Sequence, residues 1–204
     1  MILKEFTGCI MKIAVLGCGS LIWNYGSLQI NDDQWHAGGP LLPVEFARIS
    51  GGSRLTLVIK PGWQEVNTLF AISGFDNLDE AVENLWVREG AGTGRVGFYN
   101  FLNGENHLSQ ANQAIVPALI SWGKNSGTDA VIWTDLPPNF TDKTGLAYNH
   151  SGITTFFTGL NENESSSARI YVENAPLQVD TRFRSGFQLI IEQAGNRKLP
   201  NVLI

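Results

Sequence analysis

Two apolar segments separated by a glycine-rich turn place the strongest constraint on the fold of this chain. The segments are residues 43–49 and 55–59, and the residues between them read Ser-Gly-Gly-Ser-Arg. Two apolar runs of this length joined by a short glycine turn are typical of a β-hairpin. The chain is therefore expected to contain antiparallel strands.

Other apolar segments predict further strands and several helices. Strands are expected at residues 12–17, 66–72, 95–102 and 129–134, and helices at 78–89, 111–122, 165–174 and 180–193. The first helix has Asn77 at its N-cap and Gly90 just past its end. Residues before 165 are expected to be rich in loops. Strands precede helices more often than they alternate with them, so a mixed α+β fold is favoured over a doubly wound parallel sheet.

Charge and cysteine content limit the classes of partner and compartment. The net charge is −5, so neither nucleic acid nor an anionic membrane is an expected partner. No stretch reaches the ~20 apolar residues of a membrane helix. Residues 1–10 are too short and too polar for a signal peptide, and Cys9 and Cys18 do not make a disulfide framework. A cytoplasmic location is expected. No zinc-type ligand spacing is present, so no metal is expected.

A glycine loop, Gly-Cys-Gly-Ser-Leu at residues 17–21, directly follows the first expected strand. A strand followed by Gly-x-Gly begins a dinucleotide-binding fingerprint, but Ile22 stands where the third glycine belongs. A nucleophile elbow requires glycine two residues to either side of its serine, and Ser20 has Cys18 and Ile22 there. Two other interpretations of the loop are favoured over a dinucleotide site. The loop is either a tight turn or a nest of backbone N–H groups for a carboxylate or an oxyanion.

The helix expected after Asn77 carries a carboxylate on its apolar face. The apolar stripe consists of Leu78, Ala81, Val82, Leu85 and Trp86. At 100° per residue, the next position on this stripe is Glu89. Burying a carboxylate is costly unless it is paired or protonated, and such a site suits general acid/base chemistry. The alternatives are that the helix ends earlier and Glu89 turns to solvent, or that Glu89 pairs with Arg48, Arg88 or Arg95.

The order of these features resembles the γ-glutamylcyclotransferase-like family. The stretch "GCGSLIWN" is similar to the glycine loop of that family, where Tyr-Gly-Ser is usual, and "NLWVREGAG" is similar to the segment with its catalytic glutamate. The resemblance covers residues 12–102 and implies that Glu89 is the catalytic residue. It implies substrate binding by Gly17, Cys18, Gly19, Ser20 and Leu21. Cys18 stands in place of the usual tyrosine, so the contacts of that ring are missing.

The resemblance also implies a fold and a reaction. The fold is a small mixed β-barrel flanked by helices over residues 11–136, with residues 137–204 as a helical extension packed on the same domain. The reaction cyclises a γ-glutamyl amine or peptide to 5-oxoproline and releases the amine, without metal or cofactor. The alternatives are a non-catalytic domain of the same fold that binds a small molecule or a partner, and a nicotinamide-dependent enzyme. The oligomeric state stays open.

Overall fold

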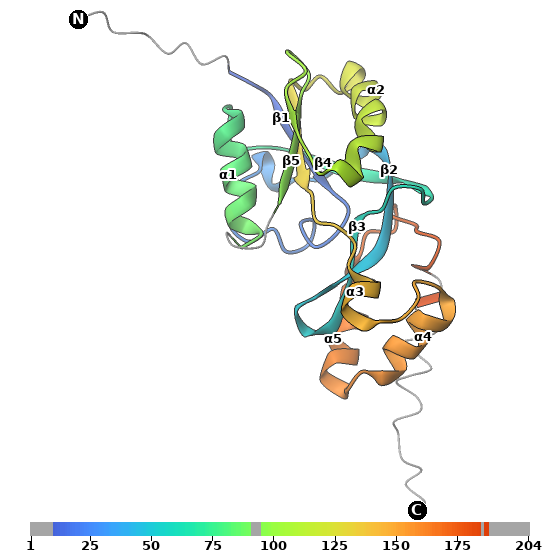
Figure 1. Ribbon diagram of the computed structural model, residues 1–204. Coiled ribbons are helices and arrows are strands. Elements are labelled where there is room, and N and C mark those ends of the chain that lie inside the picture. Colours follow the sequence, from blue (N-terminus) through green and yellow to red (C-terminus); the bar gives the residue numbers. More distant parts are fainter. Residues whose placement is uncertain (1–9, 91–94, 185, 188–204) are drawn as a thin grey trace, which may run out of the picture. The chain divides into compact units, whose positions relative to one another are not determined.

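The computed structural model describes residues 10–90, 95–184, 186 and 187, and the chain has a mixed α+β architecture (Figure 1). The expected α+β class is thus confirmed. Contacts within the chain define two compact units that are interleaved along the sequence. The first unit comprises residues up to 17, 25–40 and 69–135, and the second comprises residues 18–24, 41–68 and those from 136 onward.

The strands are hydrogen-bonded in the order β3-β2-β4-β1-β7-β5-β6. Their bounds are β1 Ile13–Gly17, β2 His36–Ser50, β3 Arg54–Ile59, β4 Glu65–Ile72, β5 Val96–Asn100, β6 Asn106–His107 and β7 Ala130–Thr134. β3 and β6 stand at the two ends of this order, so the described strands form an open mixed sheet. A closed barrel, which the family resemblance implies, is not seen in the described part of the chain.

The first unit is built on β1, whose five residues are all buried. β1 pairs antiparallel with β4 and parallel with β7, and β7 pairs antiparallel with β5. Helices α1 (Leu78–Arg88) and α2 (Val116–Ser126) cover opposite faces of these strands (Figure 1). A strand that is covered on both faces is apolar throughout, and this explains the continuous apolar run in β1.

Both helices of the first unit begin where the sequence provides a cap or a proline. The Asn77 side chain accepts hydrogen bonds from the backbone N–H groups of Asp79 and Glu80, as the N-cap pattern predicts. The segment expected as one helix from residue 111 begins as the 3₁₀ helix η3 (Gln110–Ile115) and becomes α2 around Pro117, where a missing N–H is tolerated.

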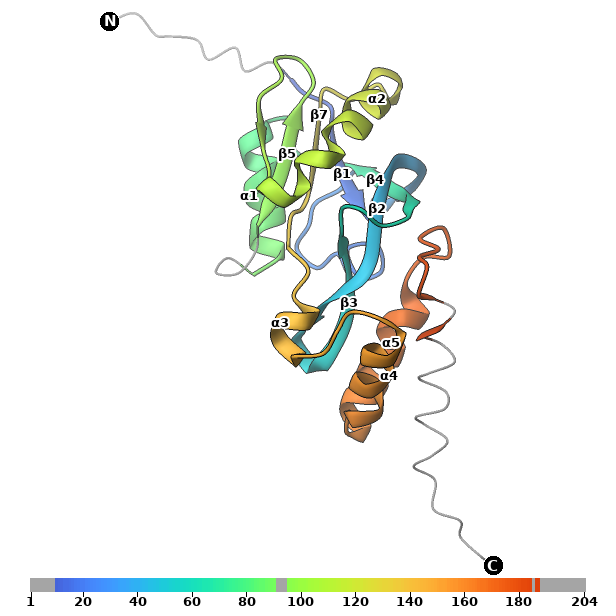
Figure 2. The ribbon, with the colours of Figure 1, turned by 45° about the vertical axis from the view of Figure 1, so that its right-hand side comes forward.

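The second unit contains the predicted hairpin of β2 and β3, with the 3₁₀ turn η2 (Gly51–Ser53) between them. Gly52 has a φ of 69°, a conformation that favours glycine. Helices α3 (Phe140–Thr144), α4 (His150–Gly159) and α5 (Glu162–Asn174) complete the unit (Figure 2). α5 packs against β3 and η2.

Two of these helices, α3 and α4, differ from the sequence prediction, which expects loops before residue 165. α4 begins at an asparagine cap, where the Asn149 side chain accepts from the Gly152 N–H. The hydroxyl groups of Thr154 and Thr155 donate hydrogen bonds within α4, to the backbone carbonyls four residues earlier. Threonine is neutral to unfavourable inside helices because its hydroxyl competes for backbone groups, so the composition of this segment does not predict a helix. Of the helix expected at 180–193, residues 185 and 188–193 lie outside the described residues.

Candidate functional site

Glu89 lies at the C-terminal end of α1, where it is the C-cap residue. Its backbone N–H still donates to Leu85 O, and Gly90 follows with a φ of 82°. The Arg88 guanidinium donates to Glu89 Oε1, and both side chains are 12% exposed. The carboxylate is thus largely removed from water, as the stripe on α1 predicted, and it is ion-paired with one of the three arginines considered.

The glycine loop begins where β1 ends and turns immediately. Ile22 N–H donates to Gly19 O and Asn24 N–H to Ser20 O, so residues 19–24 form two overlapping turns. Neither glycine of the loop has a positive φ. Gly19 is required for another reason: a Cβ at this position would lie 2.8 Å from the hydroxyl oxygen of Tyr171. Close packing, rather than a left-handed backbone, explains this glycine.

Tyr171, on α5, packs against the glycine loop within the second unit and binds it through its hydroxyl group. Its hydroxyl oxygen accepts hydrogen bonds from Leu57 N–H, at 3.2 Å, and from Ser20 N–H. Its ring packs edge-on against Trp23, with ring centroids 5.2 Å apart. Burial raises the pKa of the Tyr171 hydroxyl far above its usual value, so this group stays neutral. One N–H of the predicted nest therefore serves the protein's own tyrosine.

Tyr171→Phe is expected to lower the free energy of unfolding by about 1–3 kcal/mol, because it leaves the N–H groups of the buried Leu57 and the half-buried Ser20 without their acceptor. Urea denaturation measures this loss. Tyr25→Phe, at a partly exposed tyrosine, is the control and is expected to change stability by less than about 0.5 kcal/mol. Equal effects of the two variants would show that the Tyr171 hydroxyl does not hold the loop.

The predicted site residues are divided between the two units. Glu89 and Gly17 belong to the first unit, whereas residues 18–21 belong to the second. Within the second unit, the structure brings Gly19 and Ser20 together with Tyr171, a residue that the sequence analysis did not consider.

A second group of polar residues in the second unit was also missed, and it centres on Glu45. This residue lies on β2 and is 1% exposed. Its carboxyl group accepts from Phe46 N–H at 2.8 Å and from Phe183 N–H, and it lies against the Thr181 hydroxyl. Desolvation by burial raises the pKa of Glu45, and these hydrogen bonds together with Lys60 oppose that rise. The available signal in the sequence was a lone carboxylate within the apolar run of β2.

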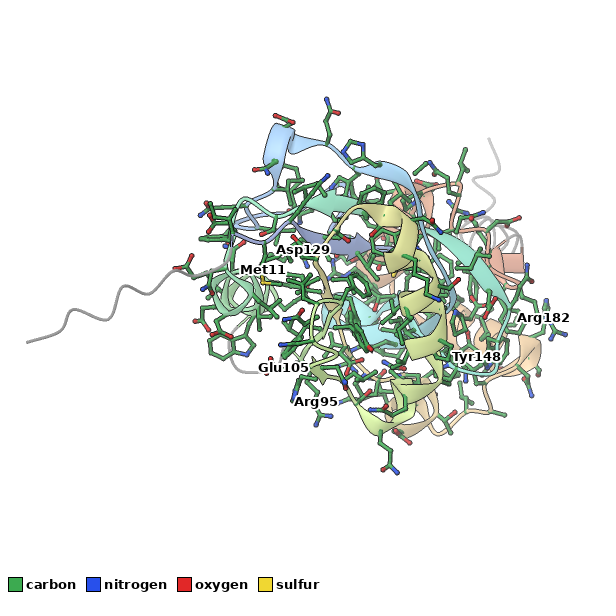
Figure 3. All side chains as sticks on the ribbon, turned by 90° about the horizontal axis from the view of Figure 1, so that it is seen from above. Met11, Arg95, Glu105, Asp129, Tyr148 and Arg182 are labelled. Atoms are coloured by element: carbon green, nitrogen blue, oxygen red, sulfur yellow. The ribbon has the colours of Figure 1, made fainter. Side chains whose placement is uncertain are left out.

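Lys60 and Tyr148 both interact electrostatically with the Glu45 carboxyl group. Burial lowers the pKa of the Lys60 ammonium and raises that of the Tyr148 hydroxyl, and the Glu45 charge raises both. Lys60 Nζ lies 4.9 Å from the ring centroid of Trp63 and 5.2 Å from that of Tyr148. Tyr148, labelled in Figure 3, donates its hydroxyl to Phe46 O at 2.8 Å. The lysine is thus held by aromatic faces.

A cavity of about 200 Å³ opens beside Lys60 and Tyr148. Its walls come from β2, the end of β3 and the segment around α3: Ala47, Lys60, Pro138, Asn139, Phe140, Thr141, Asp142 and Tyr148. The Asn139 side chain accepts from Ile49 N–H at 2.7 Å and donates to Ile49 O at 3.2 Å. Since Asn139 N–H also donates to Ala47 O, at the bulge of β2, one wall of the cavity is fixed to the strand.

The raised pKa of Glu45 predicts a pH dependence of stability. A carboxyl group that binds its proton more tightly in the folded than in the unfolded chain favours folding at low pH. The free energy of unfolding is therefore expected to fall as pH rises from the usual value of 4.5 through the raised pKa. Urea titrations between pH 4 and pH 8 measure it.

Glu45→Gln is expected to flatten this pH profile, because the amide does not ionise. Glu65→Gln serves as the matched control, since Glu65 is exposed at the start of β4. If the two variants retain the same pH dependence as the parent chain, Glu45 is not the group responsible.

Comparison of the chain with protein-family models, with curated proteins and with solved structures gave no match. Within the described residues, no three His, Cys, Asp or Glu side chains are grouped so that they could hold a metal ion. None of the described helices combines the length and the apolar character needed to cross a membrane.

Proposed function

We propose that this protein is a cyclotransferase that converts a γ-glutamyl amine or peptide into 5-oxoproline. The substrate's α-amino nitrogen attacks its own γ-carbonyl carbon, a new C–N bond closes the five-membered ring, and the bond to the leaving nitrogen breaks. The ammonium gives up one proton before the attack, and the same nitrogen gives up a second as the lactam forms. The leaving nitrogen takes up two protons and departs as an ammonium group. A single carboxylate that accepts each proton in turn and passes it to the leaving nitrogen meets the requirement. The attack is intramolecular, so it needs only a suitably folded substrate.

The placement of Glu89 carries this proposal. Its side chain is 12% exposed and is held at Oε1 by Arg88, at the end of an 11-residue helix. A carboxylate that is largely desolvated and fixed in orientation suits proton transfer better than a solvated and mobile one. We assign to Glu89 both proton transfers, as the family resemblance implies.

The glycine loop supports the proposal, but with fewer backbone N–H groups for the substrate than the nest predicted from the sequence. Ser20 N–H is bonded to Tyr171, so we assign the substrate's carboxylate or developing oxyanion to the N–H groups of Gly19 and Leu21. Neither of these two groups donates to another described residue. In this proposal Tyr171 positions the loop, and Cys18, which is half-buried, contributes its backbone. We further propose that the chain has the fold of the γ-glutamylcyclotransferase-like family and is located in the cytoplasm.

A non-catalytic binding domain is the second candidate. It is favoured by the closure of the loop by Tyr171, because an occupied N–H group is withdrawn from any oxyanion. Under this alternative the chain binds a small molecule without turning it over.

An assay of 5-oxoproline release tests the proposal. The purified chain is incubated with glutathione, with γ-glutamyl dipeptides and with γ-glutamyl amines, and the product is quantified against a reaction without protein. Release from at least one of the three classes that scales with protein concentration is the expected result. If none of the three classes yields product above the blank, the cyclotransferase is excluded and the binding domain is retained.

A further inference from the structure

The cavity beside Lys60 combines two opposite charges with apolar walls. Lys60 lies at one side, and Asp142, an exposed residue of α3, lines the same cavity. Among the described residues, neither side chain takes part in an ion pair. Two unpaired charges of opposite sign on one small cavity match a ligand that carries the two complementary charges.

The position of Lys60 leaves its charge available to a ligand. Its ammonium packs against the rings of Trp63 and Tyr148, which attract a cation but supply no negative counter-ion. Lys60 interacts electrostatically with the Glu45 carboxyl group. That carboxyl group already accepts hydrogen bonds from the backbone N–H groups of Phe46 and Phe183. A carboxylate from a ligand would complete the coordination of the lysine.

The walls of the cavity are held in place before any ligand arrives. Asn139 is bonded through its side chain to both backbone groups of Ile49, and Tyr148 is bonded through its hydroxyl to Phe46 O. A preformed site avoids the entropic cost of ordering its own walls on binding. The volume of about 200 Å³ leaves room for a molecule the size of an amino acid.

We propose that this cavity binds a free α-amino acid as its zwitterion, with the carboxylate on Lys60 and the ammonium group on Asp142. The apolar surface of Pro138 and Phe140 takes the ligand's carbon atoms, so a small aliphatic side chain fits best. This inference is independent of the cyclotransferase proposal, because all of its residues lie in the second unit and Glu89 lies in the first.

Isothermal titration calorimetry of the full chain with each common L-amino acid tests this inference. At least one small aliphatic amino acid is expected to bind saturably, and at least about tenfold more tightly than n-butyrate or n-butylamine, each of which offers only one of the two charges. The absence of saturable binding at millimolar concentrations overturns the inference. It is also overturned if butyrate or butylamine binds as tightly as the amino acid.

Variants of Lys60 and Asp142, each compared with a control, test whether these two charges bind the amino acid. Lys60→Met retains the aliphatic stem and is expected to weaken amino-acid binding at least about tenfold. Asp142→Asn is expected to weaken amino-acid binding while leaving butyrate binding unchanged. Asp142 is exposed, so this substitution is expected to leave the fold intact. Lys143→Met, at the adjacent exposed lysine, is the control. Equal affinities of the Lys60 and Lys143 variants contradict the inference. Glu89→Gln is expected to lose turnover but to keep amino-acid binding, and this result separates the binding site from the proposed reaction.

Discussion

Glu89→Gln is expected to lower the rate of 5-oxoproline release by at least about a hundredfold, the usual contribution of a positioned acid/base group. Glutamine preserves the shape of the side chain and an oxygen to accept from Arg88, but it does not take up a proton from the substrate ammonium. The rate is measured with whichever γ-glutamyl substrate the parent chain uses. Circular dichroism confirms that the variant is folded.

Two further variants separate proton transfer from the loss of an ion pair. Arg88→Met breaks the same ion pair but leaves the Glu89 carboxylate in place, so it is expected to reduce turnover much less than Glu89→Gln. Glu83→Gln removes a charge from the exposed face of the same helix and is expected to leave turnover unchanged. If Arg88→Met and Glu89→Gln lose turnover equally, the carboxylate acts only through the ion pair and is not the acid/base group.

Arg184→Met is expected to lower the free energy of unfolding by about 3 kcal/mol or more. Arg184 is 5% exposed, and its guanidinium donates to the backbone carbonyls of Pro176, Ala175 and Val179, the last at 3.0 Å. In the variant Ala175 O loses its donor, whereas Pro176 O and Val179 O keep the N–H groups of Val179 and Thr181. A hydrogen bond from a charged group contributes about 1.5–3 kcal/mol, so the loss of three such bonds exceeds the effect of most single substitutions.

The neighbouring arginine provides the matched control for this prediction. Arg182, labelled in Figure 3, is exposed, and its guanidinium lies 5.8 Å from the centroid of the Phe183 ring. Arg182→Met is expected to change the unfolding free energy by no more than about 1 kcal/mol, the size of an exposed cation–π contact. Urea denaturation followed by circular dichroism measures both variants. Similar losses in the two would show that the carbonyl contacts of Arg184 do not stabilise the fold.

The elements with strong local signals could be predicted from the sequence. The hairpin of β2 and β3 follows from two apolar runs and a glycine turn, and α1 follows from its stripe and from Asn77. The same stripe identified Glu89 as a carboxylate removed from water, and the structure gives its side chain an exposure of 12%. Each of these conclusions depends on residues within one element or its immediate neighbours, where periodicity and capping act.

The features that depend on distant residues could not be predicted. The closure of the glycine loop requires Tyr171, and the burial of Glu45 requires Thr181 and Phe183, all from the last third of the chain. No periodic pattern links a loop near the start of a chain to a helix near its end. The role of Arg184 could not be predicted for a different reason. Its partners are only 5 to 9 residues away, but a charged residue in a polar segment is usually exposed, whereas this one is buried.

The interleaving of the two units has a consequence for dissecting this protein. The chain passes from one unit to the other after residues 17, 24, 40, 68 and 135, and both β2 and β4 have residues in each unit. No single cut therefore yields either unit as one continuous fragment. A fragment that ends at residue 136 keeps the hairpin of the second unit but loses α3, α4 and α5, which contribute the wall of the cavity and the tyrosine at the glycine loop. Function in this chain is thus best mapped by point substitutions rather than by truncation.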